Sequence, residues 1–208
     1  MDSQHQTLEA LQDIKRIMER SSRFISLSGL SGLSAGICAL IGVYFASGWL
    51  KEYTAGELTI EALKSRLVFL ALAVLCLALI GAFYFTWRKA KKNKLPVWDR
   101  SSRVLMINLL IPLTTGALFV FALYLKSEWK FVAPACLIFY GLALVNASKY
   151  TLGDIRYIGI LDILLGLFGM YYSSEGLLLW AIGFGVLHII YGLIMWWKYD
   201  WKHEKESV

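Results

Sequence analysis

The chain has 208 residues, of which 58% are apolar and only 17% are charged, and its formal net charge is +6. Soluble domains average about 45–50% apolar and about 25% charged residues, so a water-soluble globule of this size could not bury the excess of apolar side chains. With 17 Gly, 3 Pro and 3 Cys, the composition also excludes collagen, a disordered chain and a disulfide-rich scaffold. It indicates an integral membrane protein.

Six apolar runs approach the length of about 20 residues that a helix needs to cross a bilayer. Apolar residues are continuous within each run rather than alternating, which argues against a β-barrel. The fifth run is the shortest and carries Asp162. We therefore predict an all-α polytopic membrane protein whose six transmembrane helices form three helical hairpins. The runs are Phe24–Leu50, Leu67–Trp87, Val104–Leu125, Phe131–Ser148, Tyr157–Tyr172 and Leu177–Trp197.

Three regions follow from these runs. Residues 1–23 place apolar side chains at helical spacing among polar ones, which predicts an amphipathic cytoplasmic helix. This helix either lies in the interface and leads into the first span, or docks a second subunit or cytosolic partner. Residues 24–197 form the transmembrane domain, and residues 198–208 form a basic and polar tail.

The distribution of Lys and Arg predicts the orientation. Sixteen of the 21 basic residues precede the first span, follow the last, or lie between spans two and three or four and five. Cytoplasmic segments carry the excess of Lys and Arg, so both termini are predicted to lie on the cytoplasmic side of a cell membrane. Because anionic lipid head groups suit this basic face, the net charge requires no nucleic-acid partner.

An internal repeat links the first two hairpins. The sequence from Glu19 to Arg23 recurs, with Asp in place of Glu, from Asp99 to Arg103, and a weaker third copy starts at Arg156. Parallel repeats of this kind predict a pseudo-symmetry axis along the membrane normal, as in some transporters, although coincidence between apolar runs is the alternative. Glu19 with Arg23, and Asp99 with Arg103, have the spacing of ion pairs at the cytoplasmic ends of helices.

Small residues recur along one face of the first, fifth and sixth spans. At this spacing they allow helices to approach closely in lipid, so we interpret them as packing surfaces; the alternative is a substrate path that they line. These residues are Ser28, Gly32, Gly36, Gly159, Gly166, Gly169, Gly185 and Gly192.

Asp162 and His188 are the only ionisable side chains clearly inside a span. Such residues are costly in hydrocarbon and usually face the protein interior. Counted from the turn between spans five and six, the two lie at similar depths, so we predict that both point into the bundle and hydrogen-bond directly or through water. The pair is either structural or a ligand or proton site. Asn108 and Asn146 form a second pair of side chains at matching depths, nearer the inner end of hairpin two. Packing is the preferred role for this pair.

Enzyme motifs are weak. Gly29-Leu30-Ser31-Gly32 resembles the GxSG motif of rhomboid proteases, which also have six core helices and a histidine on the sixth. The serine of that family is on the fourth helix, whereas Ser31 is on the first, and packing explains the local Ser-Gly repeat better. The three cysteines fall inside spans and are interpreted as packing residues. No cofactor or metal site is expected.

Three functions remain from the sequence. The preferred one is binding or moving a small solute, an ion or a lipid, which rests on the repeats and on the polar residues of hairpin three. The alternative is a membrane-embedded sensor or scaffold that docks a cytosolic protein or a second copy of the chain. An intramembrane hydrolase is a remote third, because it rests only on Asp162, His188 and Ser31.

Overall fold

The computed structural model describes residues 27–94 and 96–201, and within them the chain is helical without strands. Five helical segments are long and apolar enough to cross a membrane. Helix α6 (Ile155–Tyr171) is apolar too but has only 17 residues, which corresponds to about 26 Å of helix. The predicted amphipathic helix, and with it Glu19 and Arg23, lies outside the described residues.

Local hydrogen bonds define where the first three helices begin. Helix α2 (Gly29–Thr54) is capped by Ser28, and α3 (Ile60–Lys92) is capped by Thr59, whose side chain accepts a bond from the Ala62 amide. Helix α4 (Arg100–Leu125) starts with a capping box between Asp99 and Ser102. These side chains bond amides that have no partner within the helix, so each helix has a defined start.

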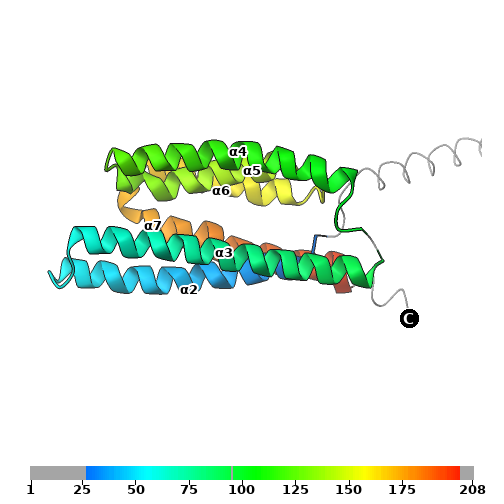
Figure 1. Ribbon diagram of the computed structural model, residues 1–208, viewed down its shortest axis with the longest axis horizontal. Coiled ribbons are helices and arrows are strands. Elements are labelled where there is room, and N and C mark those ends of the chain that lie inside the picture. The colour runs from blue at the N-terminus through cyan, green and yellow to red at the C-terminus, as the bar shows by residue number, and fades with distance from the viewer. Residues whose placement is uncertain (1–26, 95, 202–208) are drawn as a thin grey trace, which may run out of the picture.

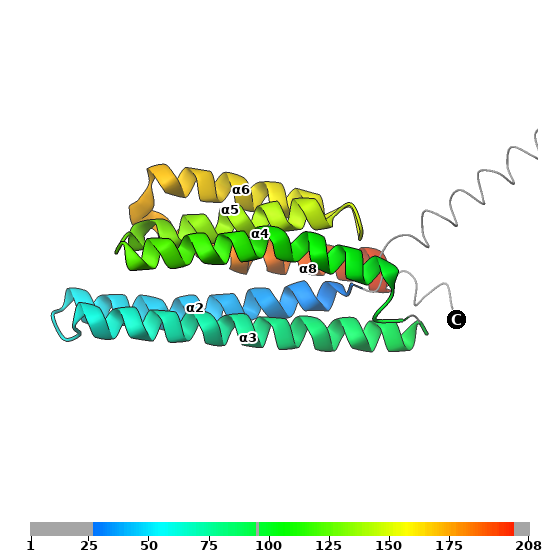
Figure 2. The same ribbon diagram turned by 45° about the horizontal axis from the view of Figure 1, so that its top comes forward.

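The remaining helices are α5 (Val132–Ala147), α6 and a continuous last helix, residues 176–201. The last helix comprises α7 (Gly176–Trp180), a π-helical turn (Ala181–Leu187), α8 (His188–Met195) and a second π-helical turn (Trp196–Trp201). The helices run alternately up and down, so the described chain begins and ends at the same end of the bundle (Figures 1 and 2). We call this end, where α3 ends and α4 begins, the basic end.

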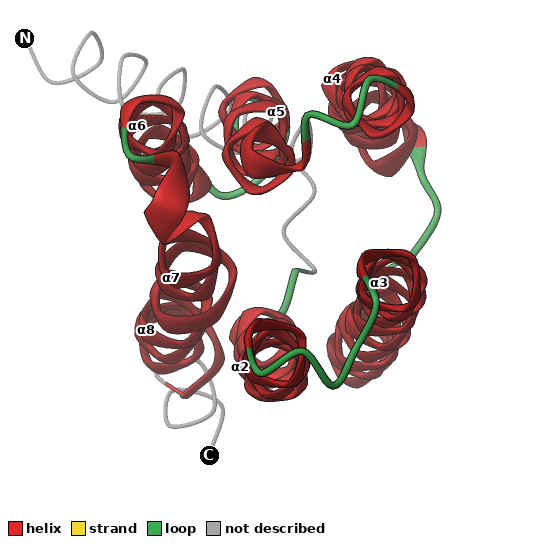
Figure 3. Ribbon diagram, turned by 90° about the vertical axis from the view of Figure 1, so that its left-hand side faces the viewer, coloured by secondary structure: helices red, strands yellow, loops and turns green. Residues whose placement is uncertain are grey.

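Neighbouring helices in sequence are not always the closest neighbours in space. Helix α2 packs along α3, α4 along α5, and α5 along α6, but the last helix packs mainly on α2 and touches α6 only lightly. Figure 3 shows the bundle end-on, with α6, α5 and α4 in one row and α2 and α3 below them. The last helix lies between α6 and α2. The third predicted hairpin is therefore present in sequence order but contributes little packing of its own.

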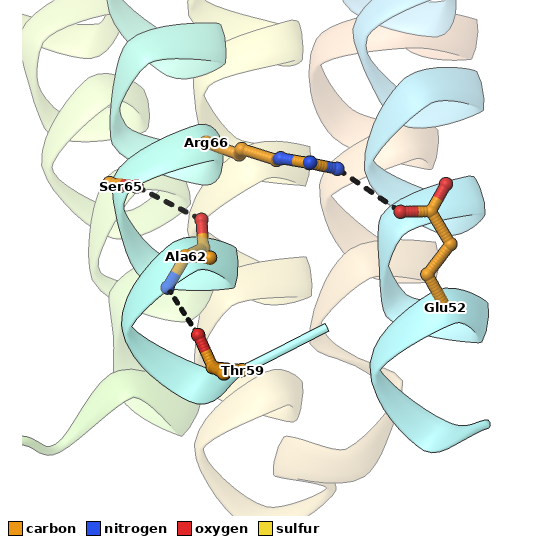
Figure 4. Close-up of polar contacts among 5 residues, drawn as sticks. All are labelled: Glu52, Thr59, Ala62, Ser65 and Arg66. Carbon is orange, nitrogen blue, oxygen red and sulfur yellow. Dashed lines mark hydrogen bonds and ion pairs between the residues drawn. The ribbon is translucent and has the colours of Figure 1, made fainter. Parts of the chain in front are cut away.

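Side-chain contacts join α2 and α3 at the end opposite the basic end. The Arg66 guanidinium lies 3.1 Å from a carboxylate oxygen of Glu52 on α2 (Figure 4). It also lies 5.7 Å from the centre of the Trp49 ring. The ammonium of Lys64 lies 5.0 Å from the centre of the Trp129 ring, which connects α3 to the turn before α5. Cations over aromatic faces suit the interface region of a membrane.

Helices α3 and α4 expose most of their apolar surface. Large side chains such as Phe69, Ile80, Phe83 and Leu118 are 65–72% exposed. In water such a surface would drive aggregation, whereas lipid chains are as apolar as these side chains. The exposed apolar faces therefore agree with a membrane environment.

Gly36 and Gly116, which correspond at the 80-residue offset of the predicted repeat, pack in different surroundings. Gly36 of α2 packs against Gly185 and Ile189 of the last helix, whereas Gly116 of α4 packs against Phe139 of α5. Likewise, Asp99 accepts a bond from the Ser102 amide, and no ion pair joins Asp99 to Arg103 within the described part of the chain. The pseudo-symmetry stays a prediction.

Candidate functional site

Asp162 lies in the middle of α6 and is completely buried, with 0% of its surface exposed. It faces the π-helical turn of the last helix. An ideal Cβ built on Gly183 of that turn would lie 2.9 Å from Oδ1 of Asp162 and would clash with the Leu137 side chain. The glycine therefore allows the backbone of the last helix to approach the carboxyl group.

The Asp162 carboxyl group has no hydrogen-bond partner. Only four buried side-chain polar atoms lack a partner among the described residues: both carboxyl oxygens of Asp162, Nε1 of Trp129 and the hydroxyl of Tyr191. Buried polar groups are almost always hydrogen-bonded, and the cost of leaving one unpaired is largest for a charged group. Two orphan oxygens on one side chain therefore mark the most unusual position in this part of the molecule.

His188, at the start of α8, has partners on both sides of its ring. Nδ1 lies 2.8 Å from the carbonyl oxygen of Gly183, and Nε2 lies 2.8 Å from the hydroxyl of Tyr140 on α5. A carbonyl only accepts, so Nδ1 carries a proton and donates it. In the neutral ring, Nε2 then accepts from the Tyr140 hydroxyl.

No direct hydrogen bond joins Asp162 and His188; the water-bridged form of the predicted pair stays a prediction. Both side chains are buried, at 0% and 6% exposure, so both face the interior. The ring of His188, however, bonds a carbonyl of its own helix and Tyr140 of α5. Asp162 instead lies against Gly183 of the π-helical turn and close to Leu137 of α5. We call Asp162, Tyr140, Gly183 and His188 the buried polar cluster.

Aromatic rings connect this cluster to the end opposite the basic end. The Tyr140 and Phe184 rings are 5.0 Å apart, and those of Phe184 and Trp180 are also 5.0 Å apart. Toward the basic end, the buried apolar residues Ile158, Ile155 and Met195 form part of one core cluster. The polar cluster is thus enclosed by aromatic groups on one side and aliphatic groups on the other.

An ion pair lies beyond the apolar layer, at the basic end. The Lys198 ammonium contacts a carboxylate oxygen of Asp154 at 2.6 Å, and the Tyr199 hydroxyl donates to the same oxygen at 3.0 Å. Both charged side chains are partly exposed. This contact joins the start of α6 to the end of the last helix without reaching Asp162.

The predicted small-residue faces pack in two separate places. On α2, Gly32 and Gly36 meet the last helix: their ideal Cβ atoms would lie 3.3 Å from the His188 carbonyl and 2.7 Å from that of Gly185. Gly192 faces the backbone of Gly29 and Leu33, while Ser28 caps α2. On the fifth span, the small residues pack instead against α5, where they meet Gly141, Ile138 and Pro134; they are Gly159, Gly166 and Gly169.

Asn108 and Asn146 are brought together, and Pro112 explains why. Proline has no N–H, so the carbonyl four residues earlier, that of Asn108, loses its helical hydrogen bond. The Asn146 amide donates to this carbonyl at 2.8 Å and also lies 3.3 Å from the side-chain oxygen of Asn108. The Asn108 amide in turn donates to the Val104 carbonyl at 2.9 Å. The pair has its partners within the protein, as expected of helix packing.

The residues of the hydrolase alternative do not form a catalytic pair. The hydroxyl of Ser31 donates to the carbonyl of Ser28 at 2.5 Å, and both ring nitrogens of His188 are engaged elsewhere. A nucleophile needs a base within hydrogen-bonding reach, and Ser31 has none in this arrangement.

The structure thus brings together two groups of polar side chains, a half-buried one with Asn108 and Asn146 and a buried one that has a carboxyl group without a partner. Neither a family model nor a curated protein nor a solved structure matches this chain, so the interpretation of the site depends on its own geometry.

Proposed function

We propose that this chain is a multi-pass membrane protein that binds and moves a small solute or ion through its helical bundle, and that Asp162 is the binding group. One observation carries the proposal: a fully buried carboxyl group has no partner in the protein. Intramembrane carboxylates typically mark ligand or ion pathways. A purely structural role would require a partner such as His188, and no direct bond to His188 is formed.

The packing around Asp162 favours a small ligand over a lipid. The carboxyl group is closed in by the backbone of Gly183 and by the side chain of Leu137, and a lipid chain would have to displace a whole helix to reach it. An inorganic ion requires only a local change. Asn108 and Asn146 have hydrogen bonds of their own, so the proposal does not place them in the site.

The orientation and the lipid partner belong to the same proposal. Helix α3 ends in Lys89, Lys91 and Lys92, next to the loop that leads into α4. The positive-inside rule places this basic end in the cytoplasm together with both termini. Basic side chains there would bind the anionic head groups of the inner leaflet, each by about 1 kcal/mol.

A sensor or scaffold is the second candidate, and the complete burial of Asp162 favours it. In this conformation no ligand reaches the carboxyl group from either end of the bundle. A scaffold would use surfaces outside the core, such as its cytoplasmic termini, to bind a cytosolic protein or a second copy. The unpaired carboxyl group then remains unexplained, which is why movement of a small ligand is preferred.

Flux measurements separate the two functions. The purified full-length protein is reconstituted into liposomes, and the entry of Na⁺, K⁺ and protons is followed separately with ion-sensitive dyes. We expect one of these ions to enter faster than in protein-free liposomes, and Asp162→Asn to abolish the difference. Asp154→Asn, which changes a partly exposed aspartate at the basic end, is the matched control and should retain the flux. Equal rates with and without protein would reject movement of these ions and favour the scaffold.

A further inference from the structure

The charge state of Asp162 decides which ligand fits. An ionised carboxylate in a low-dielectric interior, without a counter-ion or a hydrogen bond, is too costly to persist. The group must therefore either be neutral or hold a cation. Its surroundings distinguish these two cases.

No described side chain near Asp162 supplies a positive charge. Four elements pack against α6: α5, α7, the π-helical turn and the 3₁₀ turn Ser173–Glu175. Helix α5 contributes Tyr140, whose hydroxyl is bonded to His188, and Cys136, one turn further toward the end opposite the basic end. Glu175 lies in the loop at that end, and neither α7 nor the π-helical turn carries an ionisable group. His188 follows that turn, and its ring is directed to Gly183 and Tyr140.

A metal cation would also need more ligands than the site offers. Calcium and magnesium bind six or more oxygens, and transition metals favour clusters of His, Cys and carboxylate. No group of three such side chains comes together within residues 27–94 and 96–201. The carbonyl of Gly183 already accepts the His188 proton.

Na⁺ and K⁺ also bind several oxygens at once, so the smallest cation, H⁺, fits this closed site best. A proton needs no cavity, and it removes the charge that makes an unpaired carboxylate costly. The close approach of Gly183 to Oδ1 of Asp162 is compatible with a neutral carboxyl group, which requires less solvation than an anion.

We propose that Asp162 is a reversible proton-binding site, and that the ligand this protein binds and moves is H⁺. This inference rests on the proposed function and specifies its ligand. On uptake, hydronium gives up a proton, an O–H bond forms on one carboxyl oxygen of Asp162, and a water molecule is released. Release is the reverse step. Tyr140 and His188 bond each other, so neither satisfies the carboxyl group before the proton binds.

Infrared spectroscopy tests the proton directly and needs no ion gradient. Full-length protein carrying ¹³C-labelled aspartate is placed in lipid nanodiscs of phosphatidylcholine and phosphatidylglycerol. The carbonyl stretch of a protonated carboxyl group is then recorded from mildly acidic to alkaline pH, in H₂O and in D₂O. We expect a protonated aspartate band that shifts with the label, is lost at alkaline pH and exchanges with deuterium. The band should be absent in Asp162→Asn and intact in Asp154→Asn.

Other variants keep the test decisive if Asp162→Asn fails to fold. In Asp162→Glu the band should be lost from aspartate-labelled protein and appear in glutamate-labelled protein. Absence of a protonated band from the wild type overturns the proposal, and so does a band that persists in Asp162→Asn. A band that neither titrates nor exchanges would indicate a permanent structural proton and also overturns it. A titrating band in protein that carries no ion across liposome membranes would support the proton site and would reject only the proposed movement of H⁺.

Discussion

The hydrogen bond between Asn146 and the Asn108 carbonyl leads to a prediction about helix packing in this membrane domain. Pro112 removes the helical partner of that carbonyl, and the Asn146 amide replaces it at 2.8 Å. If this explanation is correct, the contribution of Asn146 to the free energy of unfolding depends on the proline. The perturbations are Asn146→Leu, Pro112→Ala and the two together.

The expected magnitudes follow from the geometry. Hydrogen bonds between transmembrane helices are worth about 0.6 kcal/mol on average and up to about 1.7. Leaving a buried carbonyl unsatisfied costs about 1–3 kcal/mol, so Asn146→Leu should lower the free energy of unfolding by about 1–2 kcal/mol. In Pro112→Ala the new N–H of residue 112 restores the helical bond. The same Asn146→Leu change should then cost less, and the coupling between the two positions should be about 1 kcal/mol.

The assay is reversible unfolding in mixed micelles of mild detergent and dodecyl sulfate, followed by circular dichroism for all four proteins. Asn108→Ala is the matched control, because it deletes the weaker side-chain contact at 3.3 Å but keeps the main-chain carbonyl. Asn146→Leu should remain costly in that background. Equal costs of Asn146→Leu with proline and with alanine at position 112 would refute the explanation.

Three further predictions use other contacts. Gly192→Ala should destabilise the protein by about 1–3 kcal/mol, because its ideal Cβ would lie 2.5 Å from a backbone nitrogen of α2. Gly48→Ala, where nothing lies within 4 Å of the ideal Cβ, should stabilise the protein by about 0.5–1 kcal/mol. Thermal unfolding in detergent measures both effects. Lys198→Met breaks the partly exposed ion pair with Asp154 and should change the unfolding free energy by less than about 1 kcal/mol, measured by the same method. In a cysteine-free background, Ser174→Cys should react with an impermeant thiol reagent added to intact cells. A cysteine in the loop between α3 and α4, at the basic end, should not react. The reverse labelling would contradict the proposed orientation.

Hydropathy predicts the helices well but not their ends. Hydropathy alone predicts Leu67–Trp87 as the second span, whereas α3 runs from Ile60 to Lys92. Its start at Ile60 is the one that Thr59, as a capping residue, predicts from the sequence. An apolar run reports only the part of a helix that needs to lie in lipid. The helix itself continues into the interface as long as its caps and charged side chains are satisfied, and Thr59 is a residue of the sequence that marks such a start.

The partners of the buried polar residues were harder to predict. Counting residues from a turn gives depth along a helix, and depth places Asp162 and His188 at one level. It does not say which helices are adjacent. That depends on side-chain shape: Gly192 and Gly32 fit the last helix against α2, which leaves α6 to pack on α5.

Two signals in the sequence could have revealed what depth alone did not. Tyrosine prefers the ends of transmembrane helices, so Tyr140, in the middle of its apolar run, required a buried partner. Pro112 stands four residues after Asn108, which is the spacing at which proline frees a carbonyl. Reading each run for polar groups that its own helix leaves unsatisfied would have selected both positions.

The two polar groups of this bundle differ in a way that bears on function. A bilayer offers no water to its core, so every polar group there needs a partner from the protein. The carbonyl that Pro112 frees has a partner in Asn146, and the ring of His188 has partners in Tyr140 and Gly183. Asp162 has no such partner among the described residues, and the proposed proton site rests on this difference.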